Sequence, residues 1–276
     1  MIPKVIHFTW FGTDPFPPLV EKCIASWKKH LPDYEIILWN ADNFDLNINP
    51  WVSQACSVKK YAFAADFARV YLLYNYGGIY LDSDIFLLQS LNPLLDNKAF
   101  TSFEPPSLST TALEGEIIGA EPHHPFFKKM VSYYEGKDFV LGEGKYDTRT
   151  FPDILYENLL SEGLSPENVE QDVADVHVYP AGYFLWACHD VVSCADNPNA
   201  YSIHYARYSW RNMDGIFIRL LVPILDYYRE HEYNIWKILK YLHLNGIMNG
   251  IYNFTRKCIM KLTAKNEEKS RGNRDS

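Results

Sequence analysis

The sequence predicts an α/β fold with a largely parallel sheet, because short strand-like segments alternate with helical ones along its first half. The strand-like segments are rich in β-branched and aromatic residues, whereas the helical ones repeat apolar residues every three or four positions. The clearest unit is residues 59–76, a helical pattern followed by Gly77 and Gly78, the residue type that commonly ends a helix. The apolar segment 79–81 comes next and has the length of a short buried strand.

The remaining elements follow from the same patterns in chain order. Residues 5–11 form the first predicted strand, which ends at Gly12 and leads into a proline-rich loop. The other predicted strands are 34–39, 99–103, 116–120 and 176–179, and the other predicted helices are 19–30, 125–134 and 152–160. We therefore expect one α/β domain over residues 1–215, amphipathic helices over 216–263 and a disordered charged tail over 264–276.

Charge and cysteine usage limit the partners and the compartment. The net charge of −8 gives no general affinity for nucleic acid, although residues 216–276 contain 11 Lys and Arg against 6 Asp and Glu. This basic, aromatic segment suits peripheral contact with an anionic membrane surface, and its alternative is an ordinary helical cap. Five cysteines without a paired spacing indicate reduced thiols, and no signal peptide is predicted. We expect a cytoplasmic protein at the inner face of the cell membrane.

Two acids follow the short apolar segment 79–81. Asp82 and Asp84 are one residue apart, so their side chains point to the same side if the strand continues. Ligands of open α/β sheets bind beyond the carboxyl ends of the strands, and carboxylates suit Mg²⁺ or Mn²⁺. The alternative is a solvated loop with two incidental acids, and this short motif alone does not decide between them.

The preceding helix adds a second pair of charges. Residues 62–73 are apolar almost all round, which predicts a buried helix, and Asp66 and Arg69 are their only charges. A spacing of three places both on one face. A surface ion pair is the alternative, but the apolar neighbours favour a buried functional pair that binds hydroxyl or phosphate groups.

The stretch AADFARVYLLYNYGGIYLDSDIF over residues 64–86 resembles the signature of the DXD-containing sugar transferases of glycosyltransferase family 32. That family includes bacterial capsule and lipopolysaccharide sugar transferases, yeast initiation mannosyltransferases and the catalytic domains of clostridial glucosylating toxins. The opening residues 2–12 are similar to its first strand, and further similarity lies at Ser26-Trp27, residues 32–35, Trp39, His204 and Ser209-Trp210.

The resemblance implies an α/β fold of the GT-A type with a mixed central sheet, a UDP-sugar donor, Mn²⁺ or Mg²⁺, and retention of anomeric configuration. It also implies a saccharide acceptor, carried on a polyprenyl diphosphate, in the synthesis of a bacterial capsule or O-antigen. UDP-galactose and UDP-glucose are the expected donors, ahead of a mannose donor.

The same resemblance implies roles for particular residues. Trp10 would stack on the nucleobase beside Thr9 in the donor site, and its alternative is a core tryptophan at a strand end. Asp66 and Arg69 would hold donor-sugar hydroxyls. The metal set would be Asp84, as a direct ligand, Asp82, mainly through water and also touching ribose or sugar, and His204. Ser209 and Trp210 would close over the diphosphate.

Two positions depart from the family pattern. Glu116 stands where relatives often have Asn, and Phe151 stands where they often have Gly before a proline. We assign no specificity to either position. No acid is identifiable as a nucleophile for double displacement, and an attack on the same face of the sugar fits this absence without being decided by the sequence.

Two other functions remain open from the sequence. A phosphatase or phosphotransferase of the haloacid-dehalogenase type also places a DxD after an apolar strand, but near the start of the domain. Here a whole α/β unit precedes Asp82, and no later acidic pair is evident. The second alternative is a non-catalytic protein that binds nucleotide sugars.

Overall fold

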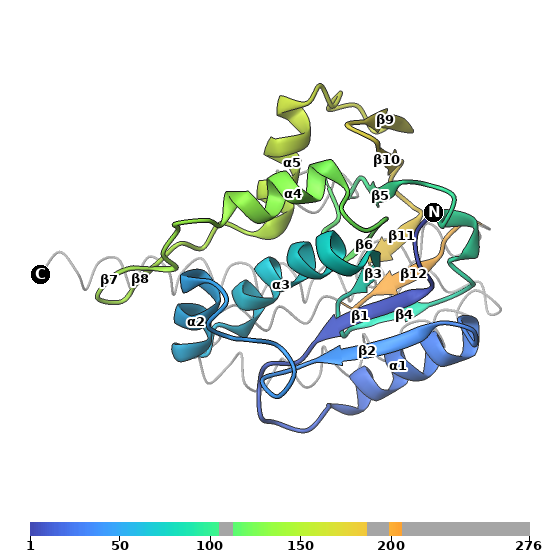
Figure 1. Cartoon of the computed structure of the whole chain (residues 1–276). Coiled ribbons are helices and arrows are strands. Elements are labelled where there is room, and N and C mark those ends of the chain that lie inside the picture. The colour runs from blue at the N-terminus through green and yellow to red at the C-terminus, as the bar shows by residue number, and fades with distance from the viewer. Residues whose placement is uncertain (105–112, 187–198, 206–276) are drawn as a thin grey trace, which may run out of the picture.

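A seven-stranded mixed sheet forms the centre of the computed structural model, which describes residues 1–104, 113–186 and 199–205 (Figure 1). Its strand order is β2-β1-β3-β6-β5-β10-β9. The strands are β1 Val5–Thr9, β2 Glu35–Trp39, β3 Gly78–Leu81, β5 Ala99–Ser102, β6 Ile117–Ala120, β9 Gln171–Val173 and β10 Val176–Tyr179.

The sheet is parallel only in part. β1 pairs parallel with both β2 and β3, and β10 pairs parallel with β5. β6 runs antiparallel to both of its neighbours, β3 and β5, and β9 runs antiparallel to β10. The expectation of a largely parallel sheet is therefore wrong, because half of the strand pairs in this sheet are antiparallel, whereas the expected α/β fold with a mixed central sheet is confirmed.

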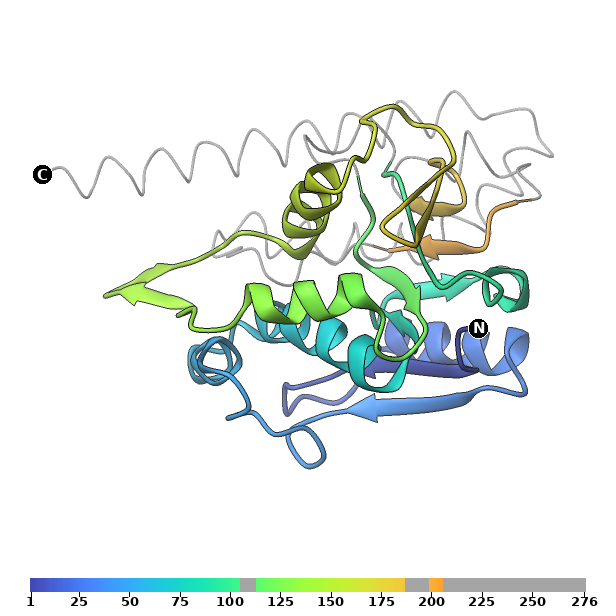
Figure 2. The same ribbon diagram turned by 45° about the horizontal axis from the view of Figure 1, so that its top comes forward.

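Helices cover both faces of this sheet (Figure 2). One face packs against α1, Pro18–His30, and against a small second sheet of order β11-β12-β4. That sheet consists of β4 Ile85–Leu87, β11 Phe184–Trp186 and β12 Ser202–His204. The other face carries α2 Pro50–Ser57, α3 Tyr61–Tyr76, α4 Pro125–Tyr133 and α5 Phe151–Ser161. A short 3-10 helix, Asn92–Leu94, precedes β5, and the hairpin of β7 Val140–Gly142 and β8 Lys145–Tyr146 projects from the body (Figure 1).

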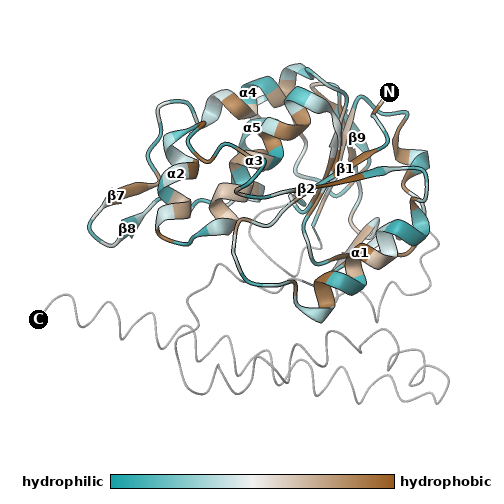
Figure 3. Cartoon of the chain, turned by 60° about the horizontal axis from the view of Figure 1, so that its bottom comes forward, coloured by the Kyte–Doolittle hydropathy of each residue, from teal (hydrophilic) through white to brown (hydrophobic). Residues whose placement is uncertain are grey.

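Side chains along the central strands point alternately to the two faces of the sheet, so the core is divided into two clusters. Ile6 and Phe8 of β1 lie with Ile79 and Leu81 of β3 in the cluster that includes α1. The residue between the last two, Tyr80, lies in the cluster on the α3 side. Teal and brown residues alternate along α1 and α4, as expected for helices with one buried side (Figure 3).

Most predicted elements are present with small changes at their ends. The first strand ends at Thr9 rather than at residue 11, and the long helix begins at Tyr61 rather than at residue 59. The sequence did not predict the short strands β4, β9 and β11 or the helix α2. A strand of only three residues is too short to show a periodicity, and α2 lies in a polar region of the sequence.

Several expectations concern residues beyond those described. Ser209, Trp210, the amphipathic helices of 216–263 and the tail of 264–276 lie outside the described residues. Within the described part of the chain, no helix is long and apolar enough to cross a membrane. Cys23 and Cys56 are free thiols there, as expected.

Candidate active site

Helix α3 buries two charged side chains against the sheet. Asp66 and Arg69 are 7% and 5% exposed, and an ion pair joins Arg69 Nη2 to Asp66 Oδ1 at 2.9 Å. The helix can bury them because it packs on β1, β3 and α4, so nearly all of its faces are covered. The buried pair that the sequence predicted is therefore present, and the alternative of a surface ion pair is wrong.

Arg69 also links α3 to the rest of the site. Its Nη2 lies 3.4 Å from Asp82 Oδ1, and its Nη1 donates to the carbonyl oxygen of Gly115. The guanidinium lies over two aromatic rings, 4.9 Å from the centroid of Tyr80 and 4.8 Å from that of Phe151. A planar cation held by two rings, a carbonyl oxygen and carboxylates has little freedom to rotate, so its position is largely fixed before any ligand binds.

The two acids of the DxD follow β3 and precede β4. Asp82 N–H donates to the carbonyl of Glu116, and Ile85 N–H donates to the carbonyl of Asp82, which closes a tight turn. Helix α1 fixes the strand that follows. Trp27 Nε1 donates to the carbonyl of Ile85 at 2.6 Å, and Ser26 Oγ accepts from Leu87 N–H at 2.9 Å.

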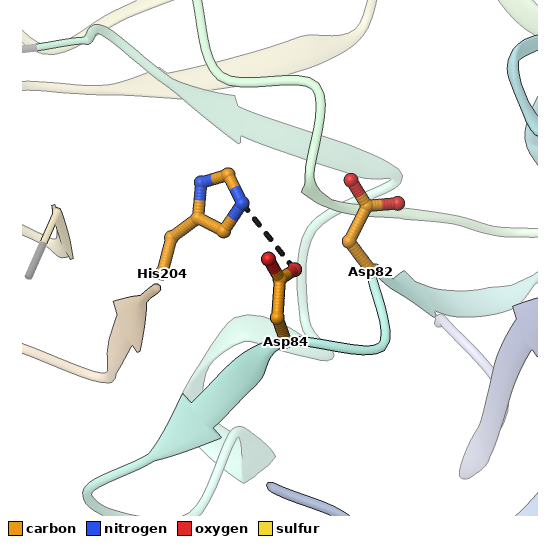
Figure 4. A group of neighbouring side chains, drawn as sticks. All are labelled: Asp82, Asp84 and His204. Carbon is orange, nitrogen blue, oxygen red and sulfur yellow. Dashed lines mark ion pairs between the residues drawn. The ribbon is translucent and has the colours of Figure 1, made fainter. Parts of the chain in front are cut away.

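The neighbouring strand brings His204 to the same place. β12 runs antiparallel to β4 with His204 opposite Ile85, and Tyr205 N–H donates to the carbonyl of Asp84. As a result, His204 Nε2 lies 3.4 Å from Asp84 Oδ1 (Figure 4). Ligand atoms of Asp82, Asp84 and His204 all lie within 4.8 Å of one another. The three residues that the resemblance assigned to a metal are thus brought together.

Two further acids reach the same histidine. Glu114, Glu116 and His204 also have ligand atoms within 4.8 Å of one another. The β3–β6 pairing sets Leu81 opposite Ile117, which places Glu116 beside the DxD turn. No role for these glutamates follows from the sequence alone. They could have been found only by predicting that the strand at 116–120 pairs antiparallel with the strand that ends in the DxD.

The electrostatics show how crowded this cluster is with negative charge. Burial, with Asp82 and Glu116, raises the pKa of Asp66 to about 7, although Arg69 opposes the shift. Burial, with Glu116 and Asp84, raises the pKa of Asp82 to about 6, again against Arg69.

His204 and Glu116 shift in the opposite sense. Burial lowers the pKa of His204, but Asp84, Glu116 and Asp82 together outweigh it and raise the value to about 9. Burial raises the pKa of Glu116, but His204, a hydrogen bond with Glu114 and Arg69 outweigh it and leave the value below the usual range. The protonated imidazole is thus a countercharge for the acids around it.

These residues fit a divalent cation. Carboxylate oxygens are the preferred ligands of Mg²⁺ and Mn²⁺, and an imidazole nitrogen is a common ligand of transition metals. Asp84 and His204 already point toward one another, with Asp82 beside them (Figure 4). Asp82 also lies 3.4 Å from Arg69. A cation here would replace the proton of His204 as countercharge, so its binding would release a proton.

The end of β1 lies at the same edge as the end of β3, because the two strands are parallel neighbours. Thr9 Oγ1 and the hydroxyl of Tyr80 form a hydrogen bond of 2.9 Å, and the Tyr80 ring contacts the Arg69 guanidinium. Trp10 is half-buried, packs edge-on against Phe16 at 5.2 Å and donates from Nε1 to the carbonyl of Asp14. The alternative of a core tryptophan at this position is therefore wrong.

Phe151 takes part in the site, which the sequence did not reveal. It begins α5, is fully buried, stacks on Arg69 and donates its backbone N–H to Asp66. The positive end of the helix thus faces a buried carboxylate.

Fold and site together define an α/β protein with a buried cluster of charged groups, suited to a cation, at the carboxyl edge of its strands. The model of the family described as "glycosyltransferase sugar-binding region containing DXD motif" matches residues 17–101. An uncharacterized glycosyltransferase of Acanthamoeba polyphaga mimivirus is 34% identical over 215 residues, which cover 68% of this chain and 85% of that protein. The chain belongs to this family of DXD-containing glycosyltransferases.

Further relatives match over shorter stretches. Inositol phosphoceramide mannosyltransferase 3 of Schizosaccharomyces pombe is 35% identical over 137 residues, 47% of this chain and 36% of that protein. A mannosyl phosphorylinositol ceramide synthase of Saccharomyces cerevisiae is 33% identical over 138 residues. The chain spans about a third of the length of these curated relatives.

Solved glycosyltransferases align over much of the chain. The PaToxG glycosyltransferase aligns with a TM-score of 0.46 at 23% identity, covering 59% of this chain and 70% of that one. The galactosyltransferase LgtC aligns with a TM-score of 0.41 at 14% identity, covering 80% and 95%. The family assignment does not depend on these alignments, and it sets aside the phosphatase alternative.

Proposed function

We propose that this protein is a retaining, metal-dependent hexosyltransferase that uses a nucleoside-diphosphate sugar, with UDP-galactose or UDP-glucose as donor. The observation that carries the proposal is the convergence of Asp66 and Arg69 with Asp82, Asp84 and His204 at one edge of the sheet. The pair of Asp66 and Arg69 suits sugar hydroxyls, and the other three residues suit a cation with a diphosphate.

The buried pair on α3 would orient the sugar. Asp66 accepts hydrogen bonds from hydroxyl groups, and the Arg69 guanidinium is already fixed by Gly115, Tyr80 and Phe151. Such preorganisation means that little side-chain freedom is lost when the donor binds, so the anomeric carbon is held ready for attack. Trp10, half-buried beside Thr9, would stack on the base.

The two aspartates have different surroundings, which supports unequal roles. Asp84 lies against His204, whereas Asp82 lies 3.4 Å from Arg69. We therefore keep Asp84 as the direct cation ligand, and Asp82 as a residue that acts on ribose, sugar and water. When bound, Mn²⁺ or Mg²⁺ supplies positive charge that stabilises a departing diphosphate.

In the transfer step, the bond between C1 and the diphosphate oxygen breaks, and the acceptor hydroxyl oxygen forms a new bond to C1. The acceptor proton passes to the departing phosphate if attack occurs on the same face, which gives retention. Asp66 and Arg69 keep the ring in place while the leaving group gains charge.

A mannose donor is the second candidate. Its support is the names of the yeast relatives, which are inositol phosphoceramide mannosyltransferases and mannosyl phosphorylinositol ceramide synthases. Those names describe proteins that this chain matches over about a third of their length.

The acceptor and the location are proposed from the resemblance and from composition. We propose a saccharide acceptor in surface polysaccharide synthesis, carried on a polyprenyl diphosphate, and action at the cytoplasmic face of the membrane. The basic composition of residues 216–276 supports docking on anionic lipid.

Thermal-shift screening tests the donor and the cation together. We expect a UDP-hexose with Mn²⁺ to raise the melting temperature of the wild type, and the Asp84→Ala variant to lose that response. CMP-sugars should have no effect. A shift with GDP-mannose alone would replace the donor assignment, and no shift with any nucleotide sugar and either cation would overturn the proposal.

A further inference from the structure

His204 has acids on two sides, and only one pair belongs to the DxD. The second pair, Glu114 and Glu116, completes a triad of possible ligands with the same imidazole. In both triads the ligand atoms lie within 4.8 Å of one another. Two ligands held about 2.1 Å from one ion are at most about 4.2 Å apart, so small side-chain rotations suffice to bring Glu116 and His204 onto one cation.

The backbone fixes Glu116 next to the DxD turn. Its carbonyl oxygen accepts from Asp82 N–H at 2.8 Å, so the ends of β3 and β6 are joined at this point. Its carboxylate accepts from Gly115 N–H at 2.8 Å, and it interacts with both His204 and Arg69. The side chain is therefore part of the same cluster as the DxD turn, His204 and Arg69.

Glu114 is buried and holds the Glu116 carboxylate by a hydrogen bond. It is 1% exposed, its N–H donates to Ser102 and its carbonyl accepts from Thr101 Oγ1 at 2.7 Å. Its side chain hydrogen-bonds with Glu116. A buried carboxyl that holds another carboxylate in place is the arrangement typical of the outer shell of a metal site.

A second polar group lies on the same side of β12. Ser202 is two residues before His204, so both side chains are on one face of the strand. Ser202 is fully buried, and its hydroxyl makes no hydrogen bond to the residues that the structure describes. This face of β12 thus carries the Ser202 hydroxyl as well as His204, the residue that lies against the DxD.

We propose that Glu116 is a further ligand of the divalent cation, joining Asp84 and His204, with Glu114 as its positioning residue. The inference rests on the proposed metal-dependent function and deepens it. A second carboxylate on the ion raises its affinity, because affinity for hard cations grows with the charge of the ligand set. The protein should consequently bind the cation before the nucleotide sugar arrives.

Mn²⁺ alone is the probe that tests this inference. Titration into the full chain, with the free ion followed by electron paramagnetic resonance, should show binding to the wild type without any nucleotide. Glu116→Gln keeps the shape of the side chain and removes its charge, and it should weaken binding about 10-fold or more. Asp84→Asn should abolish binding.

Asp66→Asn is the matched control. It removes a buried acid of the same cluster that belongs to neither triad, so it should change the affinity for Mn²⁺ by less than about threefold. Circular dichroism and melting curves establish that each variant is folded before its titration is used.

The outcomes separate this inference from the proposed function. Binding by Glu116→Gln as tight as that of the wild type, with binding lost in Asp84→Asn, would overturn the inference and leave the function intact. An equal loss in Asp66→Asn would show a general charge effect and also overturn it. No binding of Mn²⁺ alone by the wild type would overturn the inference, and the thermal shift with nucleotide sugar would then judge the function.

Discussion

At the scale of single residues, Arg69 decides whether the acidic cluster can be buried. Its guanidinium faces Asp66 and Asp82, and it lies over the rings of Tyr80 and Phe151. A buried pair adds little net stability, because desolvation offsets the Coulombic gain, but removal of one partner leaves an uncompensated charge.

The Arg69→Met variant should therefore be strongly destabilised, by about 3–5 kcal/mol in the free energy of unfolding. Urea denaturation at neutral pH measures it. Lys98→Met is the control, because Lys98 and Asp175 form an exposed pair at 3.0 Å and an exposed pair contributes less than about 1 kcal/mol. Equal losses in the two variants would contradict the assignment of Arg69 as a buried countercharge.

The sequence reveals residues of the site where one continuous segment carries them. Asp66, Arg69, Asp82 and Asp84 lie within residues 64–86, where helix and strand patterns are clear. Glu116 could not be assigned in this way, because its place depends on the antiparallel pairing of β3 with β6. The stacking of Phe151 on Arg69 depends on how α5 returns to α3, which no local pattern encodes.

At the scale of elements, the junction of β1, β2 and α3 depends on a neutral histidine. His7 is 1% exposed, its Nε2 lies 2.9 Å from the carbonyl oxygen of Gly77, and its Nδ1 accepts from Trp39 Nε1 at 3.0 Å. Only the neutral imidazole can make both contacts, donating from Nε2 and accepting at Nδ1. Burial lowers the pKa of His7 from 6.5 to about 4.

This shift predicts a pH dependence of stability. Because the pKa of His7 is lower in the folded state, the unfolded chain binds more protons between pH 6.5 and about 4. The contribution of neutral His7 to the free energy of unfolding is complete above pH 6.5. It is lost as the pH falls through this interval, by up to about 3 kcal/mol. His7→Gln cannot titrate, so the stability difference between wild type and variant should shrink as the pH falls.

Urea unfolding of both proteins at several pH values across that interval measures the difference. The comparison cancels the other titrating groups, including Asp66 and Asp82, whose raised pKa values act in the opposite sense. A stability difference that stays constant with pH would contradict a neutral buried His7.

The same junction shows why Gly78 follows the helix. Gly78 has φ +95°, and a Cβ there would lie 2.7 Å from the carbonyl oxygen of Val5. The close approach of β3 to β1 therefore needs glycine at this position, and it sets where the DxD emerges from the sheet.

At the scale of the whole molecule, two sheets meet at the candidate active site. The central sheet contributes the ends of β1, β3 and β6, and the small sheet contributes β4 and β12 (Figure 2). The sequence could predict the α/β class and most long elements, but not the small sheet, whose strands have three residues each. His204 was found by resemblance alone, since its partner Asp84 is distant in the sequence.

The most direct measurement is the release of nucleoside diphosphate from a UDP-hexose by the full chain with Mn²⁺. Asp84→Asn should reduce the rate by at least about 100-fold, because it removes a ligand of the ion that stabilises the leaving group. Asp175→Asn, which alters an acid in the exposed Lys98 pair, should release diphosphate as the wild type does. Release that is unchanged in Asp84→Asn, or no release from any nucleotide sugar with Mn²⁺ or Mg²⁺, would contradict a metal-dependent transferase.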